Sequence, residues 1–131
     1  MHNYKNLKIW DKGISISTKI FLITRNFPKS EIYGLISQMN RSSVSIPSNI
    51  AEGSARESNK DLYRFLSIAQ GSNFELETQL IISKNIDLIS KEIFEEIIED
   101  LHRLQKMIYR LKISLKVTGI KVFLMGISWL F

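Results

Sequence analysis

Residues 43–53, Ser-Val-Ser-Ile-Pro-Ser-Asn-Ile-Ala-Glu-Gly (SVSIPSNIAEG), place a proline inside an apolar pattern that repeats at helical spacing. The residues of this stripe recur every three or four positions: Ile32, Leu35, Ile36, Met39, Ser43, Ile46 and Ile50. Proline removes one helical hydrogen bond and clashes with the preceding turn, at a cost of about 3 kcal/mol. The stripe keeps its phase through Pro47, which favours one helix kinked at this residue; a break between two helices is the alternative.

Three other segments carry apolar stripes of the same period. Helices are expected over residues 5–26, about 30–53, 58–85 and 90–115. Ser58 and Ser90 are interpreted as the N-caps of the last two, and Gly53-Ser54-Ala55-Arg56 is interpreted as the stop of the second helix. No useful length of chain alternates with period two, so the predicted fold class is all-α, an antiparallel up-down four-helix bundle.

The expected core positions follow from these stripes. In the third helix they are Leu62, Phe65, Leu66, Ala69, Asn73, Leu76 and Leu80, and in the fourth they are Ile93, Ile97, Leu101, Leu104, Ile108, Leu111 and Leu115. The first helix carries two stripes: Leu7, Trp10, Ile14 and Phe21, and Ile9, Ile16, Ile20, Ile23 and Phe27. A helix that is apolar on most sides must be covered on most sides, so a homo-oligomer is expected.

Length and composition indicate one domain. The 131 residues are 44% hydrophobic and include no cysteine, which excludes a disulfide framework and thiolate chemistry and fits a reducing cytoplasm. The N-terminus does not resemble a signal peptide. Residues 117–131 are apolar with one charge, Lys121, but are shorter than the ~20 residues of a membrane span. We therefore expect a bundle domain over residues 1–116, an apolar extension over residues 117–131, a cytoplasmic location and no membrane.

Charge is unevenly distributed along the fourth helix. Residues 87–100 hold six acids and one lysine, whereas residues 102–121 hold six Lys or Arg and no acid. Such a gradient complements a helix dipole. It also predicts a basic surface for phosphate groups, which the net charge of +5 favours.

Three stretches of the chain carry a family resemblance. They are NYKNLKIWDKG (3–13), FPKSEIYGLISQMNRSSVSIPSNIAEGSAR (27–56) and NKDLYRFLSIAQGSNFELETQL (59–80). Over about residues 3–116 the chain closely resembles the four-helix-bundle proteins encoded in intervening sequences of bacterial 23S ribosomal RNA genes. The resemblance implies an antiparallel bundle that assembles into a ring-like homopentamer. The chain is also similar in fold to the accessory proteins of diversity-generating retroelements, which form basic barrels and bind nucleic acid and a reverse transcriptase.

Two departures limit what the resemblance implies. The family usually ends near Lys116, so residues 117–131 are additional, and Ala55 stands where related chains have the second glycine of GSGR. The family name records where the gene lies, and no activity follows from it.

No residue pattern predicts catalysis, a metal or a cofactor. His2 and His102 lack the spacing of a catalytic or metal motif, and the acids of the fourth helix lack the E-x-x-H of a di-iron bundle. We therefore expect a protein that is not an enzyme.

The polar residues of the family stretches are interpreted as a hydrogen-bond network, with a binding site as the alternative. They are Arg41, Asn49, Glu52, Arg56, Asn59, Glu75 and Gln79, and Pro47 and Gly53 complete the structural signature of these stretches. Glu52 and Arg56 have the spacing of a helical ion pair, and Glu75 or Glu77 is expected to meet Arg41.

Two functions are consistent with these features. The first is a nucleic-acid-binding accessory protein, for RNA or DNA, whose candidate contacts are Lys5, Lys8, Lys12, Arg103, Lys106, Arg110, Lys112 and Lys116. The second is a protein-interaction scaffold with no nucleic-acid role.

Overall fold

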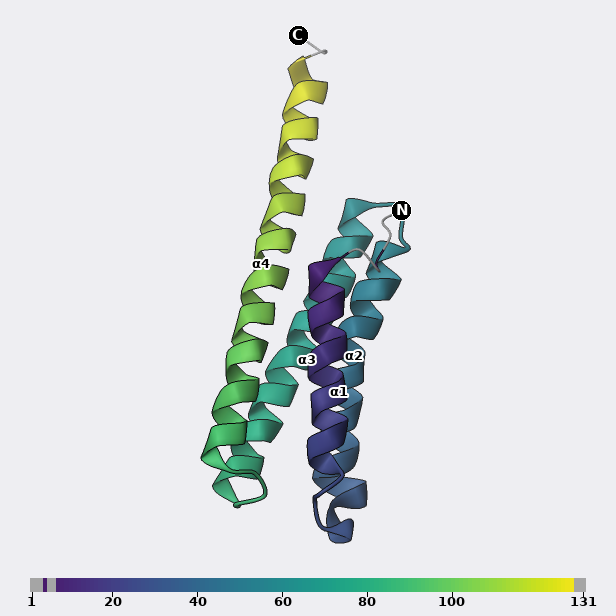
Figure 1. Ribbon diagram of the computed structural model, residues 1–131. Helices are drawn as coiled ribbons and strands as arrows, with labels where there is room; N and C mark the ends of the chain where they lie inside the picture. The colour runs from purple at the N-terminus through teal and green to yellow at the C-terminus, as the bar shows by residue number, and fades with distance from the viewer. Residues whose placement is uncertain (1–3, 5–6, 129–131) are drawn as a thin grey trace.

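The computed structural model describes residue 4 and residues 7–128, with side chains as far as residue 116. Within this part of the chain there are four α-helices and no strand (Figure 1): α1 (Lys8–Thr24), α2 (Ser37–Ser54), α3 (Asn59–Asn85) and α4 (Lys91–Ser128). A 3-10 turn, η2 (Lys29–Glu31), and a π-helical turn, η3 (Ile32–Ile36), precede α2. The predicted all-α four-helix fold is confirmed.

Each helix packs mainly against its neighbours in the sequence, and α4 also packs against α1, which closes the bundle. Figure 1 shows α4 running on past the ends of the other three helices. The boundary predicted at residue 116 falls inside α4, which continues to Ser128. None of the helices within residues 7–128 combines the length and apolar character that crossing a membrane requires.

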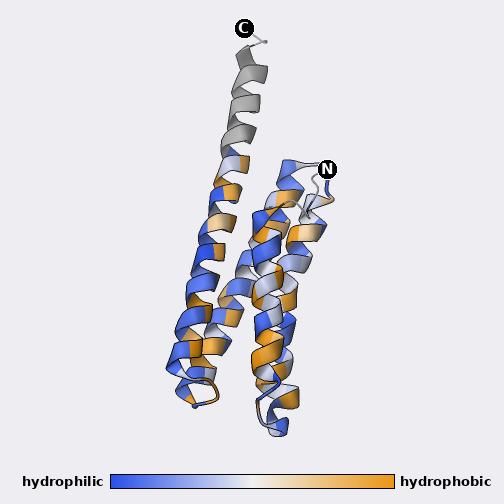
Figure 2. Ribbon diagram, viewed as in Figure 1, coloured by the Kyte–Doolittle hydropathy of each residue, from blue (hydrophilic) through white to orange (hydrophobic). Residues whose placement is uncertain are grey.

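Apolar stripes of all four helices fill the interior, and Figure 2 shows apolar and polar residues alternating along the helices. All seven predicted core positions of α3 are buried. In α4 the buried positions are Ile97, Leu101, Leu104 and Ile108. The prediction for Ile93 was wrong: it lies in the first turn of α4, at the end of the bundle, and is 40% exposed.

The two stripes of α1 have different surroundings. Ile9, Ile16, Ile20 and Phe27 of the second stripe are buried in the core. In the first stripe Leu7 and Trp10 are half-buried, whereas Ile14 is 41% and Phe21 is 45% exposed. A single chain therefore leaves part of the first stripe uncovered.

Helix α2 continues through Pro47 without interruption, so the expectation of one helix rather than two is confirmed. The kink at Pro47 stays a prediction. Pro47 is buried against α1, where a Cβ on Gly13 would lie 3.3 Å from the Pro47 Cβ. Glycine at position 13 therefore allows α1 to approach α2 closely at the proline.

The irregular backbone of this region lies before α2. Gly34, inside η3, has φ −105° and ψ −115°, outside the helical region, so α2 begins at Ser37 rather than near residue 30 as expected. Glycine tolerates this conformation because it has no Cβ. The Glu31 carboxylate accepts a hydrogen bond from the Leu35 amide at 3.5 Å beside this turn.

Serines cap the last two helices as predicted. Ser58 Oγ accepts from the Asp61 amide at 3.1 Å, and Ser90 Oγ accepts from the Ile93 amide at 3.2 Å. The predicted stop of the second helix within residues 53–56 is confirmed, since α2 ends at Ser54, although Gly53 lies inside its last turn and not past its end. A Cβ at position 53 would lie 2.7 Å from the Phe65 Cβ, so this glycine lets α2 pack against α3.

Candidate nucleic-acid interface

The cations predicted to contact nucleic acid come from α1 and α4. Lys8 is exposed at the start of α1, and Lys106 and Arg110 are exposed on α4. Lys5 lies outside the described residues. The other predicted residues, Lys12, Arg103, Lys112 and Lys116, each have a partner within the chain.

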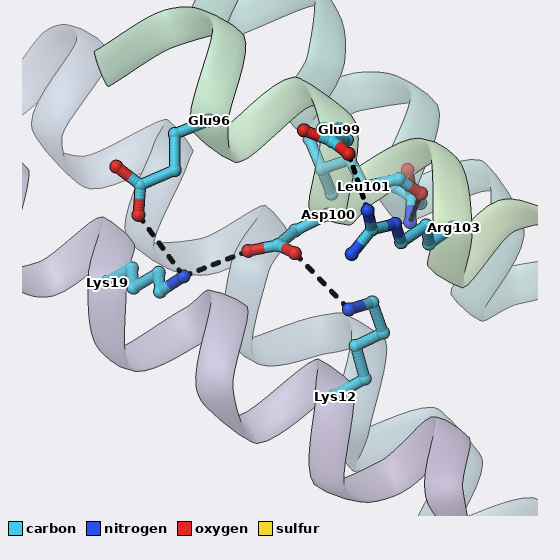
Figure 3. Close-up of polar contacts among 8 residues, drawn as sticks. Lys12, Lys19, Glu96, Glu99, Asp100, Leu101 and Arg103 are labelled. Atoms are coloured by element: carbon cyan, nitrogen blue, oxygen red, sulfur yellow. Dashed lines mark hydrogen bonds and ion pairs between the residues drawn. The ribbon is translucent and has the colours of Figure 1, made fainter. Parts of the chain in front are cut away.

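Lys12 belongs to an ion-pair cluster that joins α1 to α4 (Figure 3). Asp100 lies between two lysines, with Lys12 Nζ at 3.3 Å and Lys19 Nζ at 2.9 Å, and Glu96 lies 3.6 Å from Lys19. The hydrogen bond from Lys19 lowers the pKa of Asp100 despite partial burial, which opposes the shift, and Lys12 adds to it. The same bond raises the pKa of Lys19. The charge of Lys12 is therefore largely compensated.

Arg103 is also compensated, by an ion pair along α4 with Glu99, one turn earlier (Figure 3). Both side chains are more than half exposed, at 62% and 65%. An exposed pair of this kind contributes about 0.3–0.5 kcal/mol and can exchange partners readily.

Lys106 and Arg110 differ from these residues because they form no ion pair or hydrogen bond with the described side chains. They are one turn apart on the solvent side of α4, opposite the buried Leu104 and Ile108. Arg103, Lys106 and Arg110 form a row that we call the α4 stripe. Its last two members present uncompensated positive charge to solvent.

Lys112 and Lys116 lie on the side of α4 that faces α3. Their ammonium groups are 4.8 Å and 5.1 Å from the centre of the Tyr63 ring, which attracts cations through its π-electrons. Lys112 also donates to Gln70 Oε1 at 2.9 Å. The hydrogen bond with Lys116 lowers the pKa of the Tyr63 hydroxyl.

A hollow of about 280 Å³ adjoins these lysines, and it is lined by Asn59, Lys60, Tyr63, Leu115 and Lys116. Sequence reasoning missed Lys60 and Tyr63 as neighbours of the α4 cations. Their helical spacing on α3 was visible, but which residues of α4 they meet depends on how the two helices pack. Lys60 adds a third lysine at this end of α3.

A polar contact in the middle of the bundle fixes α3 against α4. Gln105 donates to Asn73 Oδ1 at 2.7 Å and to Glu77 Oε2 at 3.0 Å, and His102 Nε2 lies 2.6 Å from Glu77 Oε1. Burial raises the pKa of Glu77, but the hydrogen bonds from His102 and Gln105 outweigh it, so the net shift is downward. His102 therefore has a structural partner.

The polar residues of the family stretches do not form one network. Asn49 donates to Ser45 O at 2.8 Å and to Ser45 Oγ at 3.0 Å, and Ser45 Oγ is 2.7 Å from Ser72 Oγ. Glu52 and Arg56 form the predicted ion pair at 3.1 Å.

Arg41 and Glu75 lie elsewhere, on the outer side of α2 and α3. They line one open hollow of about 530 Å³ together with Gln38, Thr78, Gln79 and Ile82. Within the described residues no ion pair joins Arg41 to Glu75 or Glu77. Ser42 Oγ donates to Gln79 Oε1 at 2.7 Å nearby. Asn59 lies at the hollow beside Tyr63, so these residues occupy separate places and do not form the single network that was expected.

Candidate metal ligands do not gather in this structure. Among the residues it describes, no three His, Cys, Asp or Glu side chains are arranged to hold an ion. The acids of α4 instead form ion pairs with α1, with Lys91 and with Arg103, or face solvent.

The fold and these charged faces define an all-α four-helix bundle with a basic outer stripe on its last helix. The chain belongs to the 23S rRNA-intervening sequence protein family, whose sequence pattern matches residues 5–110. The resemblance drawn from the sequence is confirmed.

One solved structure extends the comparison. A crystal structure of a protein of unknown function from the S23 ribosomal protein family of Bacteroides thetaiotaomicron VPI-5482 has a similar fold, with a TM-score of 0.72 and 24% sequence identity. The similarity covers 79% of this chain and 97% of that chain. No curated protein matches this sequence.

Proposed function

We propose that this protein is a non-enzymatic accessory factor that binds nucleic acid, RNA or DNA, through the basic surface of α4. The observation that carries the proposal is the exposure of Lys106 and Arg110 without a partner among the described side chains. Free surface cations release counterions from phosphates when they bind, and this release supplies most sequence-independent affinity for nucleic acid.

The distribution of charge supports the same function. The acidic residues in the first half of α4 are largely engaged: Asp100 and Glu96 by α1, and Glu99 by Arg103. The second half, from Lys106 to Lys116, holds cations without acids. A phosphate backbone that approaches this half of α4 would meet cations rather than carboxylates.

We further propose a homo-oligomer, with the pentamer as its expected size. The exposed Ile14 and Phe21 of α1 support self-association, because removing exposed apolar side chains from water by covering them with a second copy is favourable. A closed ring would repeat the α4 stripe, and several weak phosphate contacts acting together raise affinity strongly.

The test compares two matched charge reversals. Lys106→Glu/Arg110→Glu should weaken binding to a short labelled oligonucleotide by at least about tenfold at low salt and reduce the salt slope by about 1 for each cation replaced. Arg25→Glu/Lys29→Glu makes the same change in net charge at exposed residues near the end of α1 and should bind almost as well as the unmutated protein.

Equal losses in the two variants would mean that net charge, and not the α4 surface, governs binding. Circular dichroism and light scattering check that both variants keep their helicity and assembly. If the unmutated protein does not bind nucleic acid at low salt, the exposed apolar residues of α1 favour the function of a protein-interaction scaffold instead.

A further inference from the structure

The packing of α3 on α4 sets which exposed residues become neighbours. Gln105 of α4 donates a hydrogen bond to Asn73 of α3. Lys112, which is seven residues later on α4, donates a hydrogen bond to Gln70, which is three residues earlier on α3. Numbers rise along one helix as they fall along the other, so the two helices run in opposite directions along this contact. We call this line of contact the α3–α4 seam.

Two large rings stand in solvent beside the seam. Tyr109 is 57% exposed and lies one turn beyond Gln105, and Phe74 is 50% exposed and follows Asn73 directly. At a rise of 1.5 Å per residue, the contacts of Gln105 and Lys112 place the backbones of these two aromatic residues within about 8 Å of each other along the bundle axis. Neither ring packs against another ring among the described residues.

Cations flank these rings on two sides. Lys106 and Arg110 lie on the solvent side of Tyr109, and Lys112 and Lys116 lie farther along the seam, held over the Tyr63 ring. A partner that covers the rings must therefore also meet positive charge.

One carboxylate of the seam, Glu77, is already engaged. Glu77 accepts from Gln105 at 3.0 Å and lies 2.6 Å from His102. Its charge is thus partly satisfied within the protein and opposes an anionic partner less than a free carboxylate would.

We propose that the α3–α4 seam binds single-stranded nucleic acid, with unpaired bases stacking on Tyr109 and Phe74 and phosphates contacting the flanking cations. This inference rests on the proposed function and names the form of nucleic acid that the surface recognises. Unpaired bases have accessible π-faces that stack on aromatic side chains, whereas a duplex keeps its bases paired and offers mainly its backbone.

The two exposed rings suit an open strand, because each offers a flat face on which one unpaired base can stack. An acidic peptide would satisfy the cations but would leave both rings without a flat partner.

The experiment measures fluorescence anisotropy at low salt with a labelled oligo-dT strand and with a mixed-sequence duplex of the same length. The unmutated protein should bind the single strand more tightly. Tyr109→Ala and Phe74→Ala should each weaken single-strand binding by between about 5-fold and 150-fold, with little change in duplex binding. Tyr109→Phe keeps the ring and should restore single-strand affinity.

Ile68→Ala is the matched control, because Ile68 is 43% exposed on α3 but lies about 120° around the helix from Phe74. It should bind both probes as the unmutated protein does. A strand carrying 5-iodouracil gives an independent readout, since light should cross-link it to peptides that contain Tyr109 or Phe74.

The outcomes separate the inference from the proposed function. Equal affinity for duplex and single strand, or ring variants that bind the single strand normally, would overturn the stacking seam and leave phosphate binding intact. Tighter binding of a poly-glutamate peptide than of oligo-dT would also overturn it. If the unmutated protein binds neither nucleic acid at low salt, both the seam and the proposed function fail.

Discussion

Lys19 on α1 and Asp100 on α4 are 81 residues apart in the sequence but lie 2.9 Å apart, Nζ to Oδ2, and join the first helix to the last. The Asp100 side chain is 20% exposed and also accepts from Lys12 at 3.3 Å. Asp100 thus ties the acidic half of α4 to α1, whereas Lys106 and Arg110 in the basic half face solvent.

Acid should weaken the contact between α1 and α4. The hydrogen bond from Lys19 lowers the folded-state pKa of Asp100 below its ordinary 3.8, so the stabilisation is complete above the unfolded value and is lost as pH falls through the folded one. Asp100→Asn should cost about 1 kcal/mol at neutral pH and should flatten the fall in unfolding free energy below about pH 4.

Urea denaturation over a series of pH values checks this prediction. Glu92→Gln is the control, because Glu92 is exposed in the first turn of α4. If the free energy of unfolding falls with pH in parallel for Asp100→Asn and for the unmutated protein down to pH 2, Asp100 does not contribute to the acid sensitivity.

Two glycines should respond to alanine in opposite directions. Gly53→Ala places a Cβ 2.7 Å from the Phe65 Cβ and should destabilise the fold by about 1–3 kcal/mol through overpacking. Gly71→Ala meets no atom within 4 Å and should stabilise α3 by roughly 0.5–1 kcal/mol, because alanine is the better helix former. Thermal denaturation followed by circular dichroism measures both; a stable Gly53→Ala variant would contradict the packing role.

The kink at Pro47 has its own test. Pro47→Ala restores a backbone donor inside α2 and should keep the fold with unchanged or higher helicity. A crystal structure of the variant should show a straighter α2 beside Gly13. An unchanged helix axis would mean that packing, and not the proline, sets its course.

Helix positions were predictable because they depend on local periodicity and caps. The third helix was expected from its stripe and from Ser58, and α3 begins at Asn59 and ends at Asn85. The η3 turn was missed because glycine at position 34 permits a helical and a non-helical backbone equally, so the pattern alone does not distinguish them.

The candidate site was predictable only in part. Lys106 and Arg110 were among the predicted contacts because residues 102–121 hold six Lys or Arg and no acid. The pairing of Lys12 with Asp100, and of Tyr63 with Lys112, depends on which faces of distant helices meet, and a stripe does not determine this. The sequence also gave no reason to group Phe74 with Tyr109.

Self-association should depend on the exposed stripe of α1. Light scattering should find a homo-oligomer, with a pentamer as the expected size, and Phe21→Glu should dissociate it by placing a charge in the covered face. Ile86→Glu, at a residue that is 52% exposed after α3, is the control and should leave the assembly intact. A monomer at tens of micromolar would contradict the proposed assembly.

The most direct test of the central claim is the salt dependence of binding by the unmutated protein. Its affinity for a short single-stranded oligonucleotide should fall linearly with the logarithm of salt concentration between about 50 mM and 200 mM, with little preference among sequences, because phosphate contacts carry no sequence information. Affinity that does not change with salt, or no binding at the lowest salt, would contradict a function carried by the cations of α4.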